Sequence, residues 1–101
     1  MWNLNDYETV EERLERYWKE HPNGKILTFR LPSPDNQYIF KAEIYRNADD
    51  SFPWATGHAE ETISQSGISK TSACENSESS SIGRALANAG YAKRGKRPCL
   101  S

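Results

Sequence analysis

The sequence has few of the residues that mark secreted, metal-binding or membrane proteins. Its only two cysteines, Cys74 and Cys99, are too few for a disulfide framework. Together with His21 and His58 they lack any closely spaced ligand pair, so we expect no structural metal and no cofactor. No hydrophobic run reaches the length of a membrane span, and the first residues lack a basic leader with an apolar core. We therefore expect a cytoplasmic protein that makes no membrane contact.

Motifs for covalent catalysis or nucleotide hydrolysis are also absent. The chain contains neither a G-x-S-x-G segment nor a glycine-rich phosphate loop, which argues against ATP-driven chemistry. An enzyme would have to use His58 with Glu60 and Glu61, or a serine of the serine-rich segment, and neither has the context of a catalytic triad. We expect a binding protein rather than an enzyme.

What the chain does contain suits one small folded domain. It has 101 residues, of which 36% are hydrophobic, including three Trp and five Tyr. This is too apolar and aromatic for a disordered chain, yet sparse for a robust monomeric core. We expect a single domain over 1–101, with a compact core at about 5–91, a basic tail at 92–101 and subunit contacts that add buried surface.

The hydrophobic pattern predicts an α+β fold in the order α-β-β-β-α. Asn5 and Glu8 have capping-box spacing before an amphipathic stretch that Pro22 ends, and Ser72 and Glu75 repeat that spacing near the second helix. Alternating residues in between indicate three antiparallel strands, with one face buried and one wet. The expected elements are a helix at 6–20, strands at 26–31, 38–46 and 53–63, and a long helix from Ala73 to Gly90, where a left-handed residue would close it. Gly57 marks a bulge or a point of close approach.

The long helix is rich in small polar residues that are mediocre helix formers. Packing or the approach of a ligand must therefore explain them, and Arg84 beside Gly83 is the leading contact residue. The alternative is that the serines cover a solvated face while Arg84 pairs with Glu78 or another carboxylate. The residues alone leave both interpretations of Arg84 open.

The segment ENSESSSIGRALANAGY resembles a motif of phage-encoded single-strand DNA annealing proteins, a superfamily that includes Erf, Red beta and the Rad fifty-two annealing domain. The match covers about the last third of the chain and places the family's arginine at Arg84. The resemblance implies a recombination mediator that anneals single-stranded DNA as a homo-oligomer, either a ring or a filament, without hydrolysing nucleotides. Its expected partners are single-stranded DNA, further copies of itself, and a phage exonuclease or host single-strand binding protein. The resemblance also implies that the protein acts in the cytoplasm of a bacterial host cell.

The charge distribution fits a DNA contact near the C-terminal end. The net charge is −1, but residues 67–101 carry six bases against two acids, whereas residues 1–22 carry six acids against three bases. Aromatic rings near this end can add base stacking. The expected DNA-binding residues are Arg84, Lys70, Lys93, Arg94, Lys96, Arg97, Arg46, Lys41 and Tyr91, with Tyr45 and Trp54 as further stacking candidates.

A second function explains the acidic N-terminal helix better than DNA binding does. In this alternative the protein is a small phage adaptor or inhibitor that binds a host protein through its helical face. The aromatic stripe of that helix is most simply core, although Trp18 could also form a subunit contact.

Overall fold

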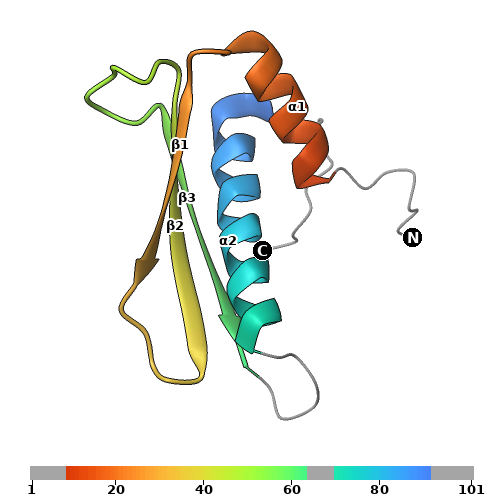
Figure 1. Ribbon diagram of the computed structural model, residues 1–101, viewed down its shortest axis with the longest axis vertical. Coiled ribbons are helices and arrows are strands. Elements are labelled where there is room, and N and C mark those ends of the chain that lie inside the picture. The colour runs from red at the N-terminus through yellow and green to blue at the C-terminus, as the bar shows by residue number, and fades with distance from the viewer. Residues whose placement is uncertain (1–8, 64–69, 92–101) are drawn as a thin grey trace.

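Two helices cover one face of a three-stranded sheet (Figure 1). The computed structural model describes residues 9–63 and 70–91. The elements are α1 (Val10–Glu20), β1 (Lys25–Leu31), β2 (Gln37–Tyr45), β3 (Ala55–Thr62) and α2 (Lys70–Leu86), followed by a π-helical turn, η2 (Ala87–Tyr91). The strands are antiparallel in the order β1-β2-β3, so the predicted α+β fold and its α-β-β-β-α order are confirmed. Within the described ranges, no helix is long and apolar enough to cross a bilayer.

The first helix starts later than the sequence predicts. Thr9 is its N-cap, and the Thr9 Oγ1 accepts a hydrogen bond from the Glu12 N–H at 3.2 Å. The expected capping pair, Asn5 and Glu8, lies outside the described residues. The predicted end at Glu20 is confirmed, because the N–H of His21 caps the last turn.

The sheet places its core on the face that the helices cover. Phe40, Ala42 and Ile44 alternate along β2 and are all buried, as the period of two predicts. The opposite face is less wet than expected, because Tyr45 is only 6% exposed. The ammonium group of Lys25 lies 4.3 Å from the centre of the Tyr45 ring and covers it.

The second helix begins at Lys70, three residues before the predicted start. Ser72 and Glu75 are therefore inside the helix and do not form the expected capping box at its beginning. Ala73 is fully buried against the sheet, so it lies within the packed part of the helix and not at its first turn. At the other end, Gly90 has φ 99°, which confirms the predicted left-handed residue.

Packing against the sheet explains the small residues of α2. A Cβ atom at Gly57 of β3 would lie 2.8 Å from the Ser81 carbonyl oxygen and 2.9 Å from the Ala85 Cα, so strand and helix backbones nearly touch. Buried serine hydroxyls bond to their own helix, Ser77 to the Ala73 carbonyl at 2.9 Å and Ser81 to the Glu78 carbonyl at 2.7 Å. The buried stripe recurs every four residues and consists of Ala73, Ser77, Ser81 and Ala85.

Candidate nucleic-acid interface

The side chain of Arg84 lies across the edge of the sheet. Its Nη1 donates a hydrogen bond to the carbonyl of His58 at 2.9 Å. One turn further along, the Asn88 Nδ2 donates to the carbonyl of Thr56 at 2.7 Å. Because β3 is an edge strand, these two bonds cover its open side. Arg84 therefore has a structural role at the sheet edge, whereas the sequence suggested that it contacts a ligand.

The role of Asn88 was missed at the sequence level, although a signal for it exists. Arg84 and Asn88 are four residues apart, which places them on one face of a helix. The carboxylate expected as a partner of Arg84 is used elsewhere, because Glu78 Oε2 accepts a hydrogen bond from Thr28 Oγ1 of β1 at 2.6 Å. That bond ties α2 to the opposite edge strand.

The other expected cations lie apart from one another and contact groups of the same chain. Lys41 projects from the sheet face opposite the helices, where its Nζ is 3.3 Å from Glu43 Oε2. The guanidinium of Arg46, just beyond β2, lies 4.4 Å from the centre of the Trp54 ring. Lys41, in the middle of β2, is the register partner of His58, whose carbonyl accepts from Arg84, whereas Arg46 follows the last residue of β2. The described cations therefore do not form one continuous groove.

Tyr91 belongs to the core rather than to an exposed stacking surface. It is 6% exposed, and its ring packs edge-on against Tyr17 at 6.1 Å and Trp54 at 5.9 Å between centroids. Its hydroxyl donates to Glu20 Oε1 at 3.0 Å. Burial, together with this bond, raises the pKa of Tyr91 to about 12. Little of the ring is left for a nucleic-acid base to stack on.

The remaining cations of the predicted site can be placed only in part. Lys70 is the first residue of α2, where the orphan backbone amides of a helix start favour an anion, but its side chain is outside the described part. The basic run formed by Lys93, Arg94, Lys96 and Arg97 also lies outside the described residues.

The two helices contact each other where they cross, on the side of α2 that faces away from the sheet. The buried Arg13 of α1 donates from Nη1 to the carbonyl of Gly83 at 2.9 Å. Gly83 has no side chain to separate them, since a Cβ atom there would lie 2.8 Å from Val10 Cγ2. We define the helix surface as the exposed residues of both elements: Glu11, Glu12, Glu15, Trp18, Lys19 and Glu20 of α1, and Thr71, Ser72, Glu75, Asn76, Ser79 and Ser80 of α2.

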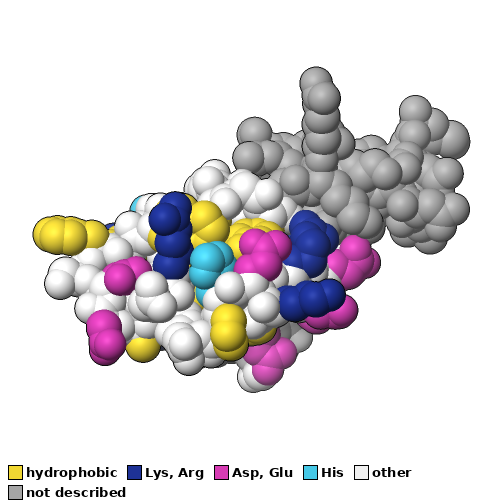
Figure 2. All heavy atoms as spheres, turned by 90° about the horizontal axis from the view of Figure 1, so that it is seen from above, with side chains coloured by type: hydrophobic (Ala, Val, Ile, Leu, Met, Phe, Trp, Pro, Cys, Tyr) yellow, Lys and Arg dark blue, Asp and Glu magenta, His cyan; other side chains and the backbone are white. Residues whose placement is uncertain are grey.

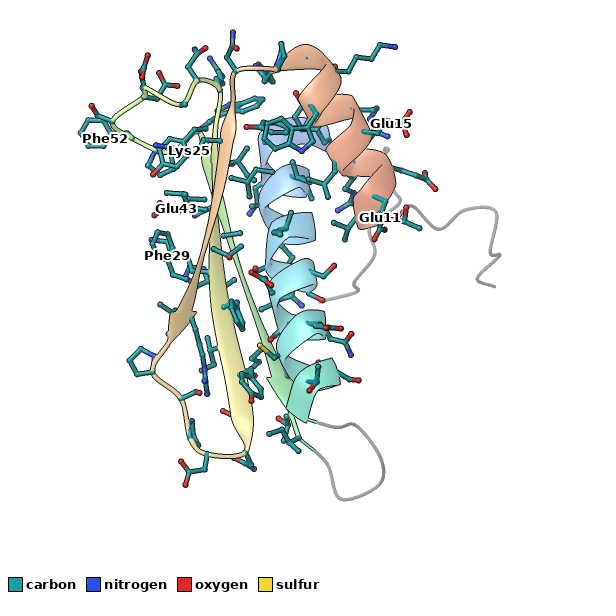
Figure 3. All side chains as sticks on the ribbon, in the orientation of Figure 1. Glu11, Glu15, Lys25, Phe29, Glu43 and Phe52 are labelled. Carbon is teal, nitrogen blue, oxygen red and sulfur yellow. The ribbon has the colours of Figure 1, made fainter. Side chains whose placement is uncertain are left out.

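The helix surface is acidic on α1 and mainly neutral and polar on α2. Glu11 and Glu15 point away from the sheet in Figure 3. Figure 2 shows one end of the molecule, where basic and acidic side chains alternate instead of forming a basic patch. A surface of this kind offers hydroxyl, amide and carboxylate groups for hydrogen bonding, with little positive potential to attract phosphates.

Comparison with known proteins identifies a family for this chain. The family model described as Slr1353 N-terminal dsRNA-binding domain-like matches residues 14–89. Searches of curated proteins and of solved structures found no match.

This match shows that the resemblance to single-strand DNA annealing proteins is wrong. The motif suggested the wrong family because its small residues are explained by packing. Ser81 and Ala85 lie against β3, and Gly83 lies against α1. A helix that must sit close to a sheet needs such residues whatever the protein binds.

Proposed function

Because the chain belongs to the Slr1353 N-terminal dsRNA-binding domain-like family, we propose that it binds double-stranded RNA by shape rather than by base sequence. The observation that carries the proposal is the extent of the match. Residues 14–89 run from the second turn of α1 into η2, and so include every strand, all of α2 and most of α1. The likeness thus concerns the whole fold and not one short motif.

The chemistry of the helix surface supports the same proposal. Duplex RNA displays 2′-hydroxyl groups along a wide and shallow minor groove. The serine hydroxyls and the Asn76 amide on the α2 part of the surface can both donate to and accept from these groups. A carboxylate such as Glu75 can accept a hydrogen bond from a 2′-hydroxyl, which DNA does not have. This surface therefore favours RNA over DNA of the same sequence.

Few phosphate contacts are expected if duplex RNA binds to the helix surface. In the described part, Arg13, Arg46 and Arg84 contact groups of the protein itself. Phosphate contacts would come from Lys19 on the helix surface, from Lys70 and from the basic run at 93–97. Binding should consequently be weak and should depend only modestly on salt, because few counterions are released.

Fluorescence anisotropy with matched oligonucleotides tests the proposal. The probes are a duplex RNA of about 20 base pairs, long enough for a site of roughly 16, the same duplex as DNA, and the single strands of each. We expect the RNA duplex to bind tightest, and a second duplex of unrelated sequence to bind equally well. Equal affinity for the DNA duplex, or no binding to any duplex, would overturn the proposal. Tighter binding to single-stranded DNA would instead favour the expectation drawn from the sequence.

A matched pair of variants locates the contact. Ser79→Asp adds a negative charge to the α2 part of the helix surface and should weaken binding to the RNA duplex. Thr62→Asp adds the same charge to the exposed face of β3 that points away from the helices, and should leave binding unchanged. The opposite ranking of these two variants would place the contact on the sheet.

The adaptor function is the competing proposal, and the acidic end of the helix surface favours it. Trp18 is 43% exposed on α1, beside Glu11 and Glu15. An exposed tryptophan within a polar rim is typical of protein contacts. A chain that binds none of the oligonucleotides, but loses a protein partner on Trp18→Ala, would support this second function.

A further inference from the structure

The two edges of the sheet differ in how they are covered. The edge of β3 receives side-chain hydrogen bonds from Arg84 and Asn88. At the opposite edge, β1 pairs with β2 on one side, and the described residues supply no strand on its other side. An edge strand of seven residues is a template for pairing with a further strand.

The register shows which peptide groups of β1 face outward. The Ile44 carbonyl accepts a hydrogen bond from the Trp54 N–H, so the peptide groups of Ile44 face β3 rather than β1. Peptide groups in an antiparallel strand alternate between its two neighbours, so Ala42 also faces β3. The β1 partners of these two residues are Ile26 and Thr28, whose N–H and C=O groups must therefore point away from β2.

The sequence of β1 is self-complementary about Thr28. If two copies pair antiparallel with Thr28 facing Thr28, Ile26 faces Arg30 of the second copy, and all three are residues with outward peptide groups. Leu27 then faces Phe29 of the second copy, twice, on the sheet face opposite the helices. These are non-hydrogen-bonded pairs, which bring side chains closest and suit an aliphatic residue against an aromatic one.

The charges also fit this register. Lys25 faces Leu31 of the second copy and Arg30 faces Ile26, so no two like charges oppose each other. A shift by one residue would lose this arrangement, because it moves every side chain to the other face. Phe29 is 42% exposed and points away from the helices, as Figure 3 shows, so it is accessible for such a pair.

We propose that two copies of this chain associate through β1, antiparallel about a two-fold axis at Thr28. The product is a continuous six-stranded sheet with all helices on one face, and its interface is isologous. The contact is small, so the association is a weak one that appears at high protein concentration. It is independent of nucleic acid and of the proposed function.

Sedimentation equilibrium of the full chain without nucleic acid tests the proposal, from about 10 μM to about 1 mM protein. We expect the average mass to rise from monomer toward dimer. Phe29→Glu should weaken association by about tenfold or more, because it replaces both Leu27–Phe29 contacts. The variant should still fold, since Lys41 faces position 29 on β2 and can pair with the new carboxylate.

A second substitution should reverse the effect of the first. Leu27→Lys combined with Phe29→Glu places opposite charges face to face across the two-fold axis, and Glu43 faces position 27 within the same chain. The double variant should therefore dimerise more tightly than Phe29→Glu alone. Arg30→Pro removes an outward N–H and should also prevent association, whereas Thr62→Glu on β3 should not change it.

Three results would overturn the proposal. The first is an unmodified chain that stays monomeric at the highest concentration. The second is association that neither Phe29→Glu nor Arg30→Pro weakens in variants whose circular dichroism is unchanged. The third is a double variant that remains as monomeric as Phe29→Glu, because the antiparallel register about Thr28 requires the two charges to meet.

Discussion

Gly57 of β3 lies directly against the backbone of Ala85 in α2, and a side chain at position 57 has no room there. A Cβ atom would be 2.9 Å from the Ala85 Cα and closer still to its amide nitrogen, which are backbone atoms that cannot rotate away. The contact explains why position 57 is a glycine, between Ala55 and Ala59 on the same face of the strand. It fixes how closely the helix approaches the sheet.

Gly57→Ala should therefore destabilise the fold by about 1–3 kcal/mol, because helix and strand must separate to admit the methyl group. Urea unfolding followed by circular dichroism measures the change. Gly83→Ala is the control, since its Cβ would meet only the movable Val10 side chain and alanine favours a helix. If both variants lose the same stability, the close backbone contact is not the cause.

Removing the cover of the β3 edge should cost stability and promote aggregation. Arg84→Met and Asn88→Leu each delete a side-chain bond to a β3 carbonyl, and each should cost about 0.5–1.5 kcal/mol. The double variant should scatter more light on heating, because its edge is open to other chains. Ser80→Ala, at an exposed position of the same helix, should do neither. Unchanged scattering in the double variant would show that these bonds do not protect the edge.

Stability should fall in strongly alkaline solution because Tyr91 resists ionisation in the fold. Its pKa is raised from 10.0 to about 12, chiefly by burial and then by the Glu20 carboxylate. The unfolded chain therefore loses its Tyr91 proton at lower pH than the folded chain. The contribution of the neutral tyrosine is complete below pH 10 and is lost as pH rises from 10 to 12.

Tyr91→Phe should make the dependence of the unfolding free energy on pH shallower over that interval. Urea titrations at several alkaline pH values measure it, and absorbance at tyrosinate wavelengths follows the ionisation directly. The slope should not vanish, because burial also raises the pKa of Tyr17. An identical slope in wild type and variant would show that Tyr91 ionises alike in both states.

The charge of the helix surface should limit the affinity for duplex RNA. Glu15→Lys replaces an exposed acid with a base, so it should tighten binding and steepen the salt dependence by about one phosphate contact. Anisotropy titrations at three salt concentrations measure both effects. Asp49→Lys makes the same charge change in the exposed β2–β3 loop and serves as the control. Equal gains from both variants would indicate a general charge effect instead of a local contact.

The sequence was sufficient for the elements whose residues alternate strictly. The β2 pattern predicted the buried face of Phe40, Ala42 and Ile44, and each strand boundary lies within two residues of its expected position. The start of α2 was harder, because Ser72 and Glu75 have capping-box spacing inside a helix as well as at its beginning. Local spacing alone does not reveal that Ala73 is already in the core.

The expected binding residues depended on long-range contacts that local patterns do not contain. Tyr91 adjoins a basic run in the sequence, but its ring packs against Tyr17, more than seventy residues earlier. Arg84 was expected to face a ligand or a carboxylate, and it bonds to the backbone of His58. Every residue has a backbone carbonyl, so neither the charge nor the spacing of the residues indicates which carbonyl accepts from Arg84.

The serine and alanine stripe of α2 has a consequence for sequence variation. The hydroxyl groups of Ser77 and Ser81 donate to carbonyls of their own helix. Towards the sheet, these two serines therefore contribute only small packing volumes. Alanine has no rotamers, and a rotation about χ1 of serine moves only its hydroxyl oxygen, so neither side chain can make room for a larger neighbour. Tolerance along this stripe should follow size rather than polarity, and relatives can exchange serine for alanine there while the separation of helix and sheet stays the same.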